Sequence, residues 1–239
     1  WRLGLGVWAI PAALALLPWL FPGRAAATPA RRDAVAARAE PTRGLTRSGL
    51  AWSMLVAFGA QAMISYIMFG WLPEILRTGG HGPAEAGFML AVFTAVGIPL
   101  SLAVPTIAAK LRDQRGLLAA TASGYAVGFP LLWRGDSPAA TWAGVLLVAV
   151  GMGAFPLLLT LFGLRTKTPE GAASLAGFSQ SGGYLVAGLG PLLVGVMYEA
   201  AGSWTPTFAL LAAATAAHLV AGWRAAKPRL LEEELAVRR

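Results

Sequence analysis

Long uninterrupted apolar stretches make up most of the chain, and each ends at charged residues or at Gly and Pro. Seven of them, at residues 3–21, 50–72, 86–109, 116–133, 140–164, 174–197 and 207–223, approach or exceed the length of a membrane span. A hydrocarbon layer about 30 Å thick needs about 20 apolar residues in a helix. The pattern predicts an all-α, polytopic membrane helix bundle with seven spans.

Composition and charge placement support this prediction. Only 13% of the 239 residues are charged, whereas an average soluble domain has about 25%. All but three of the 19 Lys and Arg, namely Arg2, Arg77 and Arg134, lie in alternate connections or in the C-terminal tail. Cytoplasmic loops carry such an excess, so we expect the basic side and the C-terminus to be cytoplasmic. The net charge of +8 is therefore explained by topology, and nucleic acid is not expected as a partner.

One long connection divides the predicted spans unequally. Residues 22–49 are rich in Ala, Arg, Thr and Pro, and six spans with short connections follow them. We predict that residues 1–22 form the last helix of an N-terminal half, 23–49 a cytoplasmic linker, 50–223 a six-helix domain and 224–239 a cytoplasmic tail. A solvated loop without a specific role is the alternative for the connection. The first residue is Trp1, and we expect the chain to start partway through a longer protein.

The residues that usually hold metals or perform catalysis are scarce. Cysteine is absent, which removes thiolate nucleophiles, Fe–S clusters and thiolate zinc sites. No Asp, Glu, Lys or Arg lies clearly inside a predicted span. We therefore expect no catalytic residue, cofactor or metal, and any charge that meets an ionic solute must come from another part of the protein.

Neutral polar residues mark two spans as candidates for a solute cavity. In the span 174–197, Gln180 and Tyr184 lie on one helical face, and in the span 50–72, Gln61 and Ser65 form a similar stripe with Tyr66 at its flank. Lipid cannot satisfy the hydrogen bonds of these groups, so they must face protein or a water-filled cavity. Both alternatives, cavity lining and bonding between helices, remain open.

Small residues and prolines indicate where helices bend or pack closely. In the span 140–164, Gly151, Gly153 and Pro156 permit a bend because proline removes one helical hydrogen bond. Gly188 and Pro191 add a similar combination to the span 174–197. We regard these five residues as hinge or packing positions. Tight packing around a kink and a gating hinge are both possible.

A charged turn joins two spans on the predicted cytoplasmic side. Arg112, Asp113 and Arg115 lie where the helix 116–133 begins, and an acid near a helix N-terminus is stabilised by the helix dipole. One interpretation is a helix cap together with the basic residues that any cytoplasmic loop carries. A latch that holds the cytoplasmic face closed is the other.

Taken together in order and spacing, several blocks resemble the C-terminal half of a major facilitator superfamily transporter, and more closely the cyanate and 2-nitroimidazole transporter family within it. The blocks are WRLGLGVWAIPAALALLPWL, GAQAMISYIMFGWLPEIL, PAEAGFMLAVFTAVGIPLSLAVP, KLRDQRG, GAFPLLLTLFGLR and GFSQSGGYLVAGLGPLLVGVMYEAAGSW. Asp113 and Gly116 match the superfamily's cytoplasmic-loop motif, whereas Ala109 and Leu117 depart from it.

The resemblance implies twelve helices in two bundles and alternating access around a midplane site in the bacterial inner membrane. The implied partners are the lipid bilayer, a small polar or anionic solute and the missing N-terminal six-helix half. We therefore expect a secondary transporter that is incomplete in this chain. An integral-membrane enzyme and a non-transporting membrane assembly or sensor protein are the alternatives.

Overall fold

The structure is a computed structural model that describes residues 6–7, 9–20 and 44–237. The chain divides into two units, residues 1–41 and 42–239. In the first unit, helix α2 (Ala9–Leu20) lies within the predicted span 3–21. Both ends of that span, and residues 23–43 of the predicted linker, lie outside the described residues.

All regular elements in the described part of the second unit are helices. They are α4 (Gly49–Thr78), α5 (Pro83–Lys110), α6 (Arg115–Arg134), α7 (Pro138–Gly151), α8 (Ala154–Leu164), α9 (Pro169–Ala201), α10 (Thr205–Ala225) and α11 (Leu231–Val237), with a 3₁₀ turn, η1 (Leu45–Arg47). Six helices of the described residues are long and apolar enough to cross a membrane, with α7 and α8 together making one of them. The six predicted spans after residue 49 are therefore confirmed as helices of the expected kind.

Caps explain why several helices extend beyond the predicted apolar stretches. The Ser48 side chain accepts a hydrogen bond from the Ala51 N–H at 3.1 Å, and Thr168 accepts one from the Gly171 N–H at 3.0 Å. These bonds satisfy N–H groups that have no partner inside the helix. At the other end of α9, Gly202 has a φ of 61°, a left-handed conformation that suits glycine and stops the helix.

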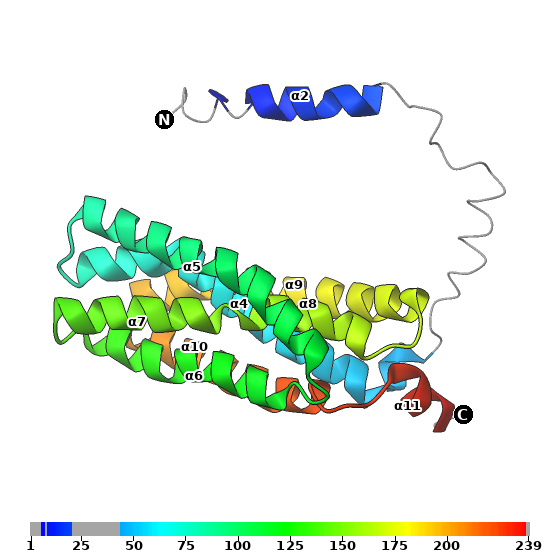
Figure 1. Ribbon diagram of the computed structural model, residues 1–239. Helices are drawn as coiled ribbons and strands as arrows, with labels where there is room; N and C mark the ends of the chain where they lie inside the picture. Colours follow the sequence, from blue (N-terminus) through cyan, green and yellow to red (C-terminus); the bar gives the residue numbers. More distant parts are fainter. Residues whose placement is uncertain (1–5, 8, 21–43, 238–239) are drawn as a thin grey trace. The chain divides into compact units, whose positions relative to one another are not determined.

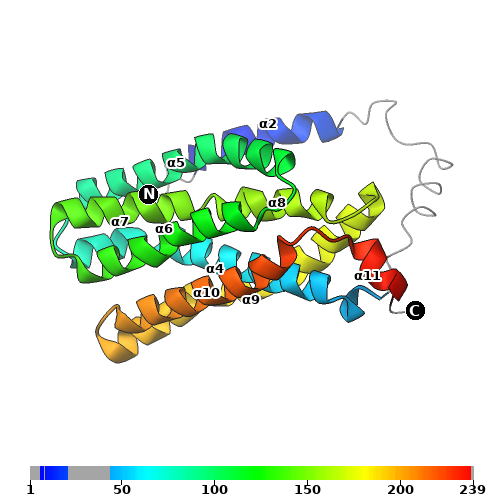
Figure 2. The same ribbon diagram turned by 60° about the horizontal axis from the view of Figure 1, so that its bottom comes forward.

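Helix α4 occupies the centre of the bundle (Figure 1). It packs against α9 and α10 and also contacts α5 and α8, while α6 packs against α7 and α10 (Figure 2). Helix α4 buries 67% of an 18-residue apolar stretch, whereas α5 and α9 each bury only 17% of a stretch of the same length. Helices α5 and α9 therefore each leave most of their apolar surface without a partner in the described bundle.

Glycines allow α4 and α9 to approach each other closely. A Cβ added to Gly183 would lie 2.8 Å from Phe58 Cδ1, and one added to Gly59 would lie 3.1 Å from the Gly183 Cα. By contrast, a Cβ on Gly188 would meet no atom within 4 Å. Gly188 therefore makes no close helix contact within the described bundle, and its assignment as a hinge or packing position stays a prediction. The contact face of α9 is a different stripe, formed by Gly171, Leu175, Ser179, Gly183, Ala187, Gly190 and Val194.

We expect Gly183→Val to destabilise the bundle and Gly188→Val, a matched change on the same helix, to leave its stability nearly unchanged. The first change forces a branched side chain into the α4 backbone, and overpacking of this kind costs about 1–3 kcal/mol. Thermal unfolding of the purified chain, followed by helical circular dichroism, measures both. Equal melting temperatures for the two variants would contradict the close α4–α9 contact.

Candidate functional site

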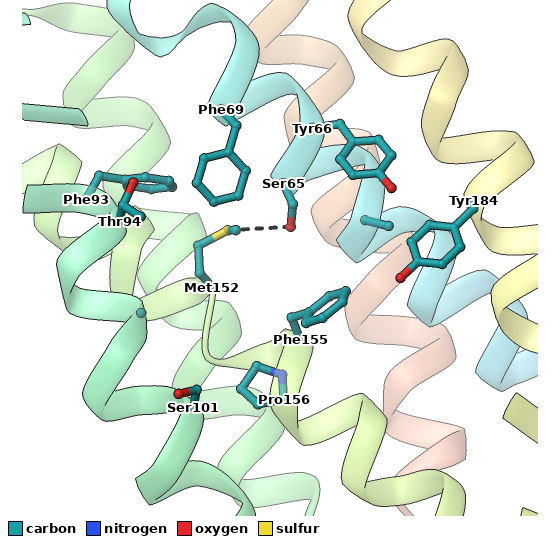
Figure 3. Close-up of a pocket in the computed structure, with 12 residues that line it drawn as sticks. Ser65, Tyr66, Phe69, Phe93, Thr94, Ser101, Met152, Phe155, Pro156 and Tyr184 are labelled. Carbon is teal, nitrogen blue, oxygen red and sulfur yellow. Dashed lines mark hydrogen bonds between the residues drawn. The ribbon is translucent and has the colours of Figure 1, made fainter. Parts of the chain in front are cut away.

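A cavity of about 280 Å³ lies at the break between α7 and α8, and α4, α5 and α9 complete its wall (Figure 3). No charged side chain is among the residues that line it. They are Ala62, Ser65, Tyr66, Phe69, Phe93, Thr94, Gly97, Ser101, Met152, Phe155, Pro156 and Tyr184. Ser65, Tyr66 and Tyr184, all predicted to be cavity residues, thus lie together at this cavity, which combines aromatic surface with hydroxyl groups.

Two tyrosines from different helices form one side of the cavity. The rings of Tyr66 on α4 and Tyr184 on α9 are nearly parallel, with an interplanar angle of 9° and centroids 6.2 Å apart. Both residues are about two-fifths exposed, at 41% and 38%. Figure 3 shows them opposite Phe93 and Thr94. Their hydroxyls form no hydrogen bond within the described residues, so both phenols are available to a solute.

The aliphatic hydroxyls of the cavity have already used their protons. Ser65 Oγ donates to the Gln61 carbonyl at 2.9 Å, Thr94 Oγ1 to Leu90 at 2.9 Å and Ser101 Oγ to Ile98 at 2.7 Å. A hydroxyl has one proton to donate, and its lone pairs remain to accept. Hydrogen-bond donation to a solute therefore falls to Tyr66 and Tyr184.

The two glutamines predicted for the cavity lie elsewhere. Gln61 is fully buried behind the cavity wall, and its Nε2 donates to the Tyr125 hydroxyl on α6 at 2.7 Å. This contact is bonding between helices, the alternative that the sequence left open. Gln180 is half-buried on α9 and is not among the cavity-lining residues.

The helix break coincides with the predicted hinge residues. Helix α7 ends at Gly151 and α8 begins at Ala154, so Gly153 lies between them, and Pro156 lies in the first turn of α8 and lines the cavity. A Cβ on Gly151 would lie 2.5 Å from the Tyr125 ring. The break is therefore both glycine-dependent and tightly packed. On α9, the Pro191 carbonyl accepts a hydrogen bond from Trp71 Nε1 at 3.1 Å.

A second, more polar cavity of about 480 Å³ lies at the ends of α4, α6 and α9 and the start of α10. Its two indole N–H groups already have partners, since Trp204 donates to Thr78 at 2.7 Å and Trp133 to Thr205 at 3.4 Å. Arg134 at its rim pairs with Asp136 at 3.0 Å. The first cavity has two phenols without partners among the described residues and lies within the spans at the α7–α8 break, whereas the second lies at the helix ends, so the first cavity is the candidate site.

The charged turn between α5 and α6 is held by a local ion pair. Arg115 Nη2 lies 2.6 Å from Asp113 Oδ2, and the Arg115 backbone N–H donates to Asp113 Oδ1 at 3.0 Å. Hydrogen bonding from Arg115 lowers the pKa of the Asp113 carboxyl below its ordinary value. Arg112 is exposed. The Asp113 carboxylate thus accepts from the N–H of the first residue of α6, while the N-cap residue itself is Gln114; the cap and latch roles both stay predictions.

A family model described as Major Facilitator Superfamily matches residues 1–191 of the chain. The chain belongs to the Major Facilitator Superfamily. The comparison with solved structures gave no match.

Several curated relatives carry transporter names. An uncharacterized transporter, YycB of Bacillus subtilis (strain 168), is 34% identical over 97% of this chain and 56% of its own length. The 2-nitroimidazole transporter of Escherichia coli (strain K12) is 38% identical over 70% of this chain and 42% of its own. The cyanate transport protein CynX of the same organism is 29% identical over 85% and 52%. The chain thus spans about half the length of the curated relatives it matches.

This superfamily member has a buried arginine hub that the sequence did not reveal. Arg165, at the end of α8, is 4% exposed, and its guanidinium donates to the carbonyls of Ala225 at 2.8 Å and Ala226 at 2.6 Å and to the Gln114 side chain. The cation thereby caps the negative C-terminal end of α10. In the sequence, Arg165 does not differ from the other Lys and Arg residues of the connections. Only its tertiary contacts identify it as a buried structural residue.

The C-terminal tail of this superfamily member is also folded against the bundle. Glu234 on α11 accepts a hydrogen bond from the Gly49 N–H at the start of α4 at 2.6 Å. Glu232 accepts one from the Lys167 N–H at 2.9 Å, and the Leu231 N–H donates to the Arg165 carbonyl at 2.9 Å. The tail therefore contacts the start of α4, the end of α8 and the connection between α8 and α9.

We expect Arg165→Ala to lower the melting temperature clearly, since two buried carbonyls and the Gln114 oxygen lose their donor. Hydrogen bonds to charged groups contribute about 1.5–3 kcal/mol. Arg112→Ala, which removes an exposed arginine from the neighbouring turn, is the control and should change stability by less than about 0.5 kcal/mol. Equal melting temperatures for Arg165→Ala and Arg112→Ala would contradict a stabilising role for the Arg165 contacts.

Proposed function

We propose that the chain supplies one of the two six-helix bundles of a secondary transporter that moves a small polar or anionic solute by alternating access. The transporter names of the relatives and the chain's share of their length support this proposal. In it, residues 1–22 belong to the N-terminal half, 23–49 form the linker and 50–223 the C-terminal half. The protein is then a transporter rather than an enzyme.

The observation that carries the proposal is a cavity flanked by unpartnered apolar surface. Helices α5 and α9 both contribute to the cavity wall, and both leave most of their span exposed. On α9 the exposed side chains include Leu185, Leu189 and Leu192 at 78%, 55% and 68%. A second bundle packed on these faces would close the cavity and remove it from lipid, which matches a site at the interface of two repeats.

The chemistry of the cavity favours a small solute that accepts hydrogen bonds. Tyr66 and Tyr184 supply the donors, and Phe69, Phe93 and Phe155 supply apolar contact. The cavity wall carries no formal charge, so a positive charge for an anionic solute would come from the other bundle. The energy for accumulation would come from an ion or solute gradient.

Uptake by the full-length protein in vesicles tests the proposal, with radiolabelled cyanate and 2-nitroimidazole as probes. We expect saturable uptake of at least one probe by the full-length protein and none by the present chain alone. Tyr184→Phe should raise the half-saturation concentration roughly five-fold, because one neutral hydrogen bond contributes about 1 kcal/mol. Tyr198→Phe, at the other cavity, is the control.

Two results would contradict the proposal. The absence of saturable uptake of both probes by the full-length protein would exclude the solute class. Saturable uptake by the present chain as a monomer would exclude the need for a second bundle.

The proposal also predicts how the chain is oriented in a bacterial plasma membrane, with the C-terminus on the cytoplasmic side. Because the chain has no cysteine, single cysteines can report it. We expect Gly79, Ser137 and Ser203, each changed to Cys, to react with an impermeant maleimide from outside intact cells, and Ala27→Cys to react only after the cells are opened. Protection of any of the first three from outside would contradict the topology.

A further inference from the structure

A chain of buried polar groups lies directly behind the cavity wall. We propose that Gln61 and Tyr125 are positioning residues, which hold the Met152 side chain in the wall and thereby set which solutes fit. Neither residue lines the cavity, whereas Met152 does. The inference rests on the proposed function for its solutes, but its structural part can be tested without transport.

The distances join three helical segments at one sulfur atom. Gln61 Nε2 on α4 lies 2.7 Å from the Tyr125 Oη on α6, and that oxygen lies 3.4 Å from Met152 Sδ at the α7–α8 break. Gln61 Nε2 itself lies 4.0 Å from the same sulfur. Ser65 Oγ also approaches the sulfur, at 3.7 Å (Figure 3).

The direction of the hydrogen bonds assigns the decisive contact to Tyr125. The Gln61 amide donates to the Tyr125 oxygen, so the Tyr125 proton is free to point at the sulfur, which is a weak acceptor. The Ser65 proton is already donated to the Gln61 carbonyl at 2.9 Å. Gln61 therefore orients the Tyr125 hydroxyl, and the Tyr125 hydroxyl holds Met152.

The ring of Tyr125 fixes the backbone beside the sulfur. Gly151, the last residue of α7, lies so close to the ring that a Cβ there would be 2.5 Å from Cδ1 and Cε1. A methionine side chain has three rotatable bonds and adapts to irregular gaps. Without the hydroxyl, the Met152 side chain would be free to swing into or out of the cavity.

Burial supports a positioning role over simple core filling. Gln61 and Tyr125 are both 0% exposed, and the buried Gln61 Oε1 has no hydrogen-bond partner among the described residues. A leucine at this position would fill the space without leaving a polar atom unsatisfied. A leucine would, however, lose the hydrogen bond that the Gln61 amide donates to the Tyr125 hydroxyl.

Tyr125→Phe is the sharpest test, because it removes only the hydroxyl and keeps the ring under Gly151. In the full-length protein we expect oxidation of Met152 by dilute hydrogen peroxide to accelerate about five-fold, as expected for loss of one hydrogen bond. Met197, which is also half-buried, serves as the reference within the same digest. Peptide mass spectrometry measures both sulfoxides, and Tyr198→Phe is the control variant.

Transport measurements then show whether the positioning sets specificity. We expect Tyr125→Phe to change the ratio of the half-saturation concentrations for 2-nitroimidazole and cyanate while leaving the maximal rate nearly intact. In a Met152→Leu background the same change should have little further effect, since residues that act through one another are not additive.

Several outcomes overturn or support the proposal separately from the transporter function. Unchanged Met152 oxidation in both Tyr125→Phe and Gln61→Leu would overturn it, as would a lower melting temperature with an unchanged half-saturation ratio. Additive effects of Tyr125→Phe and Met152→Leu would also overturn it. If no probe is transported by the wild type but Met152 oxidation still rises in Tyr125→Phe, the transporter proposal fails and the positioning of Met152 is supported.

Discussion

Lipid offers no hydrogen bonds, so a polar group on a spanning helix is costly unless it meets a partner inside the protein or faces a water-filled cavity. Several of the hydrogen bonds that join different spans of this bundle involve α4. Gln61 bonds across to α6, and His218 on α10 lies with its Nδ1 3.1 Å from the Ala57 carbonyl of α4. A carbonyl only accepts, so Nδ1 carries the proton. These bonds link α6 and α10 to α4 and place the polar atoms in the interior.

The same constraint bears on the apolar surfaces of α5 and α9 in different ways. On α5, Thr94 and Ser101 bond back to carbonyls of their own helix, whereas the buried Ser179 hydroxyl on α9 has no hydrogen-bond partner among the described residues. Helix α5 therefore needs no polar partner from a neighbour and can face either lipid or another apolar helix. The cavity opens beside α5 and α9, which have the least buried spans of the described bundle. Because α5 and α9 are the least buried helices and also border the cavity, the opening of the cavity and the unpartnered apolar surface lie on the same side of the described bundle.

The sequence predicted the helices well and the site only in part, for a physical reason. Apolar length and bounding charges determine which segments span, and both are local properties. The helical period placed Ser65, Tyr66 and Tyr184 on polar faces, but it does not specify which neighbour a face meets. Gln61 was therefore expected in the cavity, whereas its amide donates a hydrogen bond to Tyr125 on α6. Arg165 and the α11 tail depend on contacts between segments far apart in the chain, which no local pattern indicates.

The helix break shows how a polar interior can shape an otherwise neutral cavity. Met152 and Gly153 keep helical backbone angles at the break, and the Met152 N–H still bonds to the Val148 carbonyl at 3.1 Å. The backbone does not fix the sulfur, however, because three rotatable bonds of the methionine side chain lie between them. The constraint comes instead from Tyr125, through its ring on Gly151 and its hydroxyl on the sulfur. Because Gln61 orients that hydroxyl from the central helix, any shift of α4 relative to α6 is transmitted to the cavity wall. A neutral cavity discriminates mainly by shape, so the second layer of residues, rather than the lining alone, determines what it accepts.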